Sequence, residues 1–337
     1  MIDILNAFAL LANFVIVPAL AYGSQLALGA LGVTMVYAVL RFSNFAHGET
    51  MSFGAMISVL GTWGLQEAGI TFGALPTALL ALPISIIATV GVCLFSDRLV
   101  YRYYRSQKAA PVTYLIISVG VLFVLSGVIR FTIGPKDQIF ADGQRFILKA
   151  RAFKEMTGLD QGLAIKTTQG VTVVTAVVIV ALLFWFLNRT RTGKSMRAYS
   201  DNEDLALLSG INPARVVMIT WIITGALAAI AGTLYGLDKG YKPFTYLGLV
   251  LPIFSAAIVG GVGNPVGAIF GGFVIAFSEM LLTFAYKRVI AYLTPGEWVP
   301  DGLMQLLATD YKLAVSFVIL VIVLLIKPTG IFSGKTL

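Results

Sequence analysis

The chain has 337 residues, is 58% hydrophobic and only 12% charged, and has a mean hydropathy of +0.89. Soluble domains carry roughly a quarter charged residues, so this composition excludes a water-soluble globular protein. The net charge of +8 would suit a nucleic-acid-binding protein, but the basic residues stand at the ends of long apolar runs. Basic residues in that position orient membrane spans, so we expect a lipid bilayer and no nucleic acid as partner.

The apolar runs predict an all-α, polytopic membrane protein. A helix needs about 20 apolar residues to cross a bilayer core, and a backbone in lipid must satisfy its own hydrogen bonds. Spans are expected at about 8–40, 45–66, 74–96, 111–133, 171–188, 214–237, 245–263, 265–286 and 311–327. The prediction is one transmembrane permease domain over 1–337, a helical bundle of about 8–10 transmembrane segments that includes broken helices.

The first apolar run is long for a single crossing. Pro18 and Gly23 predict either one kinked helix or a short interfacial segment followed by a span. The start of the chain lacks the basic region of a signal peptide, so we expect this run to be retained.

Loop charges predict the orientation. Residues 97–108 carry four basic residues against one acidic residue, and residues 188–215 carry five against three. Both loops are expected to be cytoplasmic under the positive-inside rule. The balanced segment 287–312 suits the outer side. The loop at about 134–168 is net positive but must also be external, because of the spans around it.

The first candidate site is the run 44–49, between two apolar stretches. It contains an amide (Asn44), the only histidine (His47), Gly48 and a carboxylate (Glu49). Polar groups at such a place are costly unless they are paired or face water. The run is either a short cytoplasmic loop with a helix N-cap, or a break in a membrane helix that lines a cavity. We predict the second, with these four residues along the substrate pathway.

The second candidate is the Gly- and Pro-rich run 260–267. Gly and Pro weaken a helix by about 1 and 3 kcal/mol respectively, and here they interrupt an apolar stretch. The run is either a tight turn between two spans or a discontinuous helix beside the pathway. Breaks in both halves of a chain are typical of transporter repeats. The predicted pathway residues here are Gly260, Gly261, Gly263 and Asn264.

The third candidate is the loop 190–213. Ser200 and Glu203 have the spacing of a capping box, Gly210 is suited to end a helix, and Asn212 precedes a proline that would start the next one. A short helix of about nine residues is expected, either lying on the bilayer or docking a soluble subunit through exposed leucines. The candidate docking residues are Arg197, Ser200, Asp201, Asn202, Glu203, Leu205, Leu208 and Gly210.

Other classes of site lack their sequence signals. The chain has no phosphate-binding loop of the form G-x-x-x-x-G-K-S/T, no set of Cys and His residues to ligate a metal, and no G-x-S-x-G nucleophile elbow. We therefore expect no catalytic residue, no metal and no cofactor in this chain.

Five motifs carry a resemblance to a known family: NFAHGE at 44–49, RLVYR at 98–102, MRA at 196–198 with LSGIN at 208–212, AAIVGGVG at 256–263, and KPTGIF at 327–332. In this order, over about residues 25–333, they resemble the branched-chain amino acid ABC transporter permeases of the LivH type. Departures are the segment before Tyr22 and an insertion at 287–310 that contains Pro295-Gly296-Glu297.

The resemblance implies a multi-pass permease of the bacterial inner membrane that imports branched-chain or other neutral amino acids. It implies a second permease subunit, two cytoplasmic ATPases that bind ATP-Mg and dock on 190–213, and an external substrate-binding protein. Glu49 would meet the ammonium of the substrate, and Asn264 or amides near Gly261 its carboxylate. Alternatives are a urea or short-amide permease, an ion-coupled transporter or channel, and an assembly protein.

Overall fold

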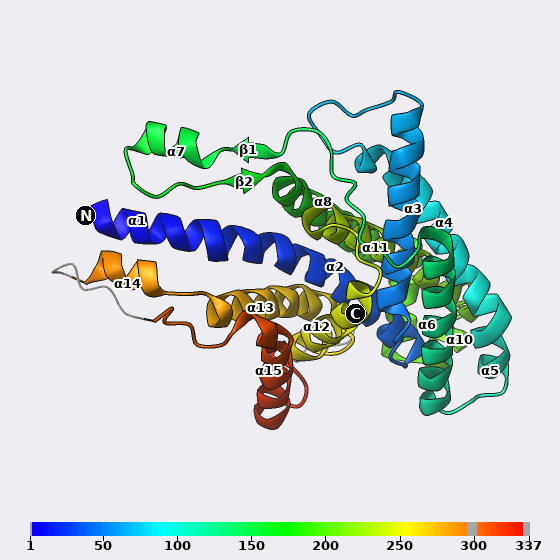
Figure 1. The fold of residues 1–337 in the computed structure, drawn as a ribbon. Helices are drawn as coiled ribbons and strands as arrows, with labels where there is room; N and C mark the ends of the chain where they lie inside the picture. Colours follow the sequence, from blue (N-terminus) through cyan, green and yellow to red (C-terminus); the bar gives the residue numbers. More distant parts are fainter. Residues whose placement is uncertain (1, 295–301, 333–337) are drawn as a thin grey trace.

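The computed structural model describes residues 2–294 and 302–332, so the predicted insertion residues Pro295-Gly296-Glu297 lie outside the described part (Figure 1). Its elements run in the order α1 (Ile2–Leu11), α2 (Val17–Leu40), α3 (His47–Glu67), α4 (Ala78–Ser96), α5 (Arg102–Ser106), α6 (Pro111–Ile133), β1 (Phe146–Leu148), α7 (Ala150–Thr157), β2 (Ile165–Lys166), α8 (Thr167–Arg189), α9 (Arg191–Asp201), α10 (Glu203–Leu208), α11 (Pro213–Lys239), α12 (Thr245–Gly260), α13 (Pro265–Thr283), α14 (Lys287–Leu293) and α15 (Lys312–Ile326).

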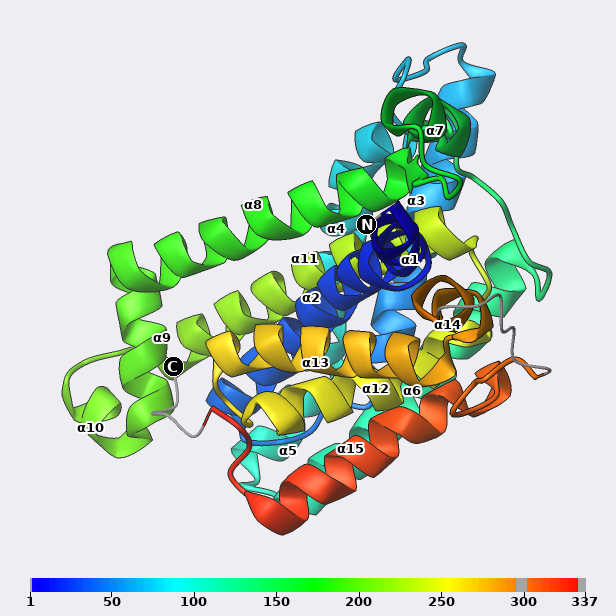
Figure 2. The same ribbon diagram turned by 90° about the vertical axis from the view of Figure 1, so that its left-hand side faces the viewer.

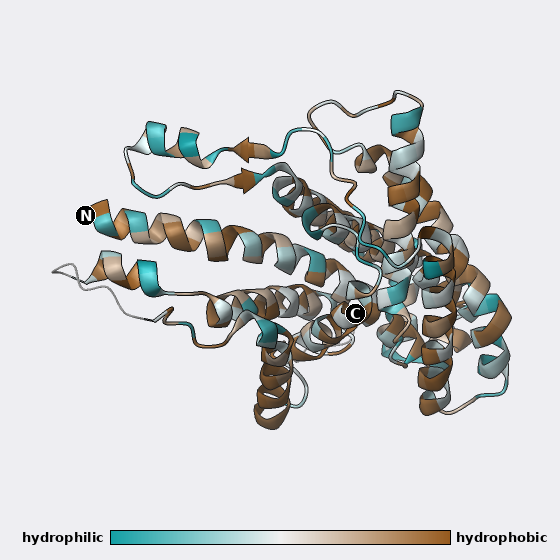
Figure 3. Ribbon diagram, viewed as in Figure 1, coloured by the Kyte–Doolittle hydropathy of each residue, from teal (hydrophilic) through white to brown (hydrophobic). Residues whose placement is uncertain are grey.

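The predicted all-α, polytopic fold is confirmed. Within the described ranges, seven helical stretches are long and apolar enough to cross a membrane. Together with α3, of 21 residues, and α12, of 16 residues, they make nine, which lies inside the expected range. Figure 3 shows hydrophobic residues along α15, and large apolar side chains on α6 and α15 are exposed, among them Phe131 and Leu325. A lipid-facing surface accounts for such exposure.

The N-terminal run forms one continuous helical stretch from Ile2 to Leu40. A π-helical turn at Ala12–Ile16 joins α1 to α2, and Pro18 follows directly in the first turn of α2. Proline removes a backbone donor, and a wider helical turn beside it accommodates the change in hydrogen bonding. The helix therefore does not divide into an interfacial segment and a separate span.

The loops gather at two ends of the bundle as their charges predict. At one end Arg105, Lys108, Tyr199 and Glu203 help to line a cavity of about 250 Å³, which brings the two basic loops together. At the other end the loop 134–168 contacts the segment after α3 and the C-terminal end of α14. Its β1–β2 hairpin is antiparallel.

Helices in the two halves of the bundle pack in the same pattern, both within each half and across the halves. In the first half α3 packs on α4, and in the second α12 packs on α13. Across the halves, α2 packs on α13 and α12, whereas α11 packs on α4 and α3. Figure 2 shows α8, α2, α13 and α15 running side by side. Helices α2 and α11 thus form the centre, each followed by a helix that contacts the opposite half.

Glycine allows α11 and α3 to touch through their backbones. A Cβ on Gly232 would meet the carbonyl of Met51, and a Cβ on Gly54 would meet the backbone of Ala229. Small residues at a helix interface permit this close approach in membranes. Both helices are therefore held at a separation that a larger side chain cannot enter.

We expect Gly232→Ala to lower stability by about 1–3 kcal/mol, because the added methyl group would overpack the contact with Met51. The measurement is the thermal midpoint of the purified chain in detergent. Gly127→Ala on α6 is the matched control, since a Cβ there meets nothing within 4 Å. Equal midpoints for the two variants would contradict the close approach.

Candidate transport site and docking segment

The segment 41–46 re-enters the bundle between α2 and α3. The imidazole of His47, the first residue of α3, lies against Gly32 of α2. Gly32 precedes the end of α2 at Leu40 by eight residues, or about 12 Å of helix. Helix α3 thus begins well inside the bundle, which is the broken-helix arrangement rather than a loop at the surface.

Specific side chains satisfy the backbone of this first break. The Asn44 carboxamide oxygen accepts from the Ala46 amide at 3.2 Å and lies 3.5 Å from the Tyr101 hydroxyl. The Ser118 hydroxyl accepts from the Phe45 amide at 3.1 Å. Buried backbone groups need such partners, because no water replaces them in lipid. The side-chain amide of Asn44 therefore stabilises the backbone of the break.

Glu49 lies in the first turn of α3 and is 1% exposed. Its carboxyl group hydrogen-bonds with Ser126 of α6 and lies within electrostatic range of Arg130 of the same helix. The Arg130 guanidinium in turn lies 4.2 Å over the centre of the Phe244 ring, directly before α12. An aromatic face and a nearby acidic group reduce the cost of keeping the Arg130 guanidinium in the bundle.

A second break, at 240–244 between α11 and α12, contacts the first. The Tyr241 hydroxyl is 3.2 Å from that of Ser52 on α3, and the Tyr246 hydroxyl donates to the Gly232 carbonyl at 2.8 Å. Gly48 lies against the Tyr246 carbonyl, where no Cβ would fit. The first turns of α3 and α12 therefore meet; Gly48, Ser52, Tyr241 and Tyr246 are called the junction below.

The junction is suited to an anion but is closed. Helix N-termini carry unpaired amides and a positive partial charge, which favour carboxylates. All four junction residues are buried, and Ser52, Tyr241 and Tyr246 are 0% exposed, so the junction is not open to solvent. This second break escaped prediction because Gly240 and Pro243 fall between two expected spans and look like an ordinary loop.

The predicted break at 260–264 is instead a tight turn between α12 and α13. Gly261 and Gly263 have φ values of +113° and +84°, which favour glycine. Asn264 caps α13 by accepting from Val266 and Gly267, and its amide donates to the Phe332 carbonyl at 3.1 Å. The interpretation of Gly260, Gly261, Gly263 and Asn264 as a discontinuous helix is therefore corrected, because their polar groups complete a turn.

The C-terminal motif closes over this turn. The Ile331 amide donates to the Val259 carbonyl at 2.8 Å, the Phe332 amide donates to the Gly260 carbonyl at 3.3 Å, and Gly330 lies against Gly261. Residues 327–332 form what we call the clasp. Two motifs far apart in the sequence thus build one structural unit.

The docking loop contains two helices, α9 and α10, where one was predicted. Asn202, not Ser200, caps α10, since its side chain accepts from the Leu205 amide at 3.0 Å. The capping box at Ser200 is wrong, because the Ser200 hydroxyl is buried and donates to the Ala38 carbonyl of α2 at 3.0 Å. Gly210, with φ +79°, ends the segment and Asn212 caps α11, as predicted.

Helix α10 lies at the periphery of the bundle, at the far end of α9 (Figure 2). Leu205 is 60% exposed and Leu208 is 85% exposed, so the predicted apolar face is present. Arg197 points back to the bundle, where it donates to Asn188 at 3.1 Å. Of the predicted docking residues, Ser200 is buried and Arg197 is half-buried, whereas the others are exposed, namely Asp201, Asn202, Glu203, Leu205, Leu208 and Gly210.

Neighbouring groups set the protonation of two side chains at the ends of the bundle. Burial raises the pKa of Tyr199, as does its hydrogen bond to Glu203 at 2.6 Å, so the phenol stays protonated. At the other end burial tends to raise the pKa of Asp142, but hydrogen bonds from Thr77 and Gln66 outweigh it and lower the pKa. Asp142 is therefore an anion fixed by two elements.

The chain is thus a polytopic helical bundle with a break in each half and a peripheral helix that exposes leucines, an arrangement typical of membrane transport proteins. The family described as "Branched-chain amino acid transport system / permease component" matches residues 15–324, and the chain belongs to this family.

Relatives match along nearly the whole chain. The high-affinity branched-chain amino acid transport system permease protein LivH of Escherichia coli is 32% identical over 92% of each chain. The corresponding protein BraD of Pseudomonas aeruginosa is 28% identical over 94% of each chain. A probable branched-chain amino acid transport permease protein LivH of Methanocaldococcus jannaschii is 28% identical over 93% of this chain and 90% of its own.

We expect Glu49→Gln to lower the free energy of unfolding by about 1–3 kcal/mol, because it leaves Arg130 without its acidic neighbour. Removing both charges, in Glu49→Gln with Arg130→Gln, should cost less than the sum of the single changes. Thermal unfolding in detergent measures both. The control is Arg151→Gln, whose ion pair with Glu155 is exposed and should contribute almost nothing. Strict additivity would show that Glu49 and Arg130 do not interact.

Proposed function

We propose that this chain is a permease subunit of an ABC importer that moves branched-chain or other neutral, hydrophobic amino acids into the cytoplasm across a bacterial inner membrane. The observation that carries the proposal is the match over more than nine-tenths of the chain to permeases named for branched-chain amino acid transport. The multi-pass bundle supports it, because it offers helices to enclose a path and two breaks within it.

The proposed complex contains a second, homologous permease subunit, two cytoplasmic ATPases and an external substrate-binding protein. ATP-Mg would bind to the ATPases, and this chain would contribute neither a catalytic residue nor a cofactor. Leu205 and Leu208 on α10 would dock the ATPase, since exposed apolar side chains outside the lipid mark contact surfaces.

Contacts at the end of α9 would transmit ATPase motion to the bundle. The Ser200 hydroxyl donates to the Ala38 carbonyl, and Arg41 donates to the Ser200 carbonyl, so α9 is fastened to the last turn of α2. The first break begins at that same point. A push on α10 would therefore reach the segment 41–46 and, through it, the junction.

Alternating access would open the junction, which is closed in this structure. Asn44, His47, Gly48 and Glu49 would border the path, with the N-termini of α3 and α12 facing the substrate carboxylate. Asn264 is left out of this proposal, because its side chain is engaged in the turn and the clasp.

We expect Leu208→Asp to abolish co-purification of the ATPase with the permease, because it places a charge in an apolar contact. Met156→Asp is the matched control, since Met156 is 79% exposed on α7 at the opposite end of the bundle. Retention of the ATPase by Leu208→Asp would contradict docking through α10.

The assembled complex in proteoliposomes, with its binding protein outside and ATP inside, is expected to accumulate radiolabelled leucine. Omission of ATP or of the ATPases should reduce uptake to the background of empty vesicles. Uptake by this chain alone would instead indicate a secondary transporter, and uptake of urea in place of leucine would indicate an amide permease.

A further inference from the structure

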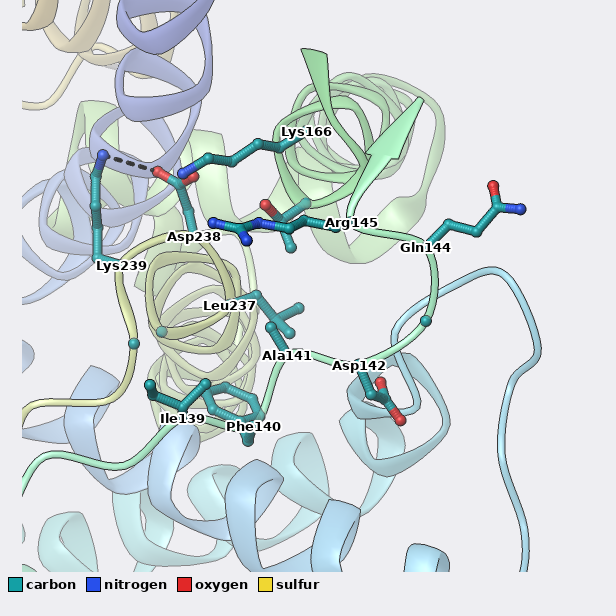
Figure 4. A pocket seen from close by; sticks show the side chains of 14 residues that line it. Ile139, Phe140, Ala141, Asp142, Gln144, Arg145, Lys166, Leu237, Asp238 and Lys239 are labelled. Atoms are coloured by element: carbon teal, nitrogen blue, oxygen red, sulfur yellow. Dashed lines mark ion pairs between the residues drawn. The ribbon is translucent and has the colours of Figure 1, made fainter. Parts of the chain in front are cut away.

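A cavity of about 490 Å³ lies at the external end of the bundle, between residues 139–145 and the last turn of α11 (Figure 4). Its volume falls within the range of small-molecule sites. One side is apolar, formed by Ile139, Phe140 and Leu237, and the other side is charged. The charged lining residues are Arg145, Lys166, Asp238 and Lys239, with Asp142 at the margin.

The charged side of the cavity carries more basic than acidic side chains. Figure 4 shows Arg145, Lys166 and Asp238 directed toward one region of the cavity, whereas Asp142 lies apart from them. The Asp142 carboxylate is engaged by the Thr77 amide at 2.6 Å and by Gln66 at 2.9 Å. Three cations thus line the cavity against two carboxylates, and Asp142 lies apart from Arg145 and Lys166, so an anionic group would be attracted to these two cations.

One oxygen of the Asp238 carboxylate is available to accept a hydrogen bond. Its side chain is 2% exposed, and its Oδ2 pairs with the Lys239 ammonium at 3.1 Å. Within the described residues its Oδ1 has no hydrogen-bond partner. It also lies at the C-terminal end of α11, where the helix dipole disfavours a negative charge. A buried carboxylate in this position is suited to receive a cationic donor from a ligand.

We propose that this cavity binds a free zwitterionic α-amino acid with an apolar side chain. The ammonium donates to Asp238, the carboxylate is held by Arg145 and Lys166, and the side chain lies against Phe140 and Leu237. The link of this ligand to transport depends on the proposed function, but the site itself is separate from the junction.

Lys239 connects this cavity with the interior. It also lines a second cavity of about 300 Å³, together with Tyr22, Tyr235, Glu279 and Lys312. There Lys312 pairs with the buried Glu279 at 3.5 Å and lies 4.3 Å over the Tyr22 ring. The external cavity therefore adjoins a charged region between the helices, as expected of an entry site.

The experiment is calorimetric titration of the full chain in lipid nanodiscs with L-leucine. Two probes that each lack one charge, 4-methylpentanoate and isopentylamine, are expected to bind at least tenfold more weakly than leucine. Asp238→Asn should weaken leucine binding at least tenfold but leave 4-methylpentanoate unchanged. Arg145→Gln combined with Lys166→Gln should weaken both, and Arg151→Gln on α7 should weaken neither.

Failure to bind leucine at millimolar concentration, by a chain that elutes as a single species and unfolds cooperatively, would overturn this inference. Equal leucine binding by Asp238→Asn and the natural chain would overturn it as well. ATP-driven leucine uptake by the assembled complex separates the two proposals: uptake without binding refutes only the cavity, and binding without uptake refutes only the transport function.

Discussion

The structure depends on satisfying backbone groups where helices are interrupted inside a bilayer. Water is absent there, so each amide freed by a break needs a protein partner. At the first break Asn44 and Ser118 provide it, and beside the second break Tyr246 bonds to the backbone of the neighbouring α11. Because Ser118 and Gly232 belong to neighbouring helices, both breaks depend on the packed bundle for part of their hydrogen bonding.

The same requirement explains why glycine lies where the breaks meet. A hydrogen bond from Tyr246 to Gly232, and the contact of Gly48 with the Tyr246 carbonyl, both need backbones close together. Any larger residue at Gly48 or Gly232 would separate α3, α11 and α12. A displacement of the end of α2 beside α9, as proposed above, would therefore act on a tightly packed unit.

Features with local causes could be predicted from the sequence. Apolar runs gave the spans, loop charges gave the grouping of loops, and Gly210 and Asn212 gave helix ends. Features decided by distant partners could not. Ser200 has the spacing of a cap, but α2 takes its hydroxyl, and the run 260–264 looks like a broken helix until the clasp is seen. Nothing in the sequence around Tyr241 marks it as part of the junction, since its partner Ser52 is 189 residues away.

The clasp also bears on how the chain matures during synthesis. The carbonyls of Val259 and Gly260 receive the amides of Ile331 and Phe332, which leave the ribosome more than a helix later, after α13, α14 and α15. Until residues 331 and 332 have been made, the Val259 and Gly260 carbonyls at the tip of the α12–α13 hairpin lack these partners. Helix insertion proceeds from the N-terminus, so the closure of this turn must wait for a segment that follows α15.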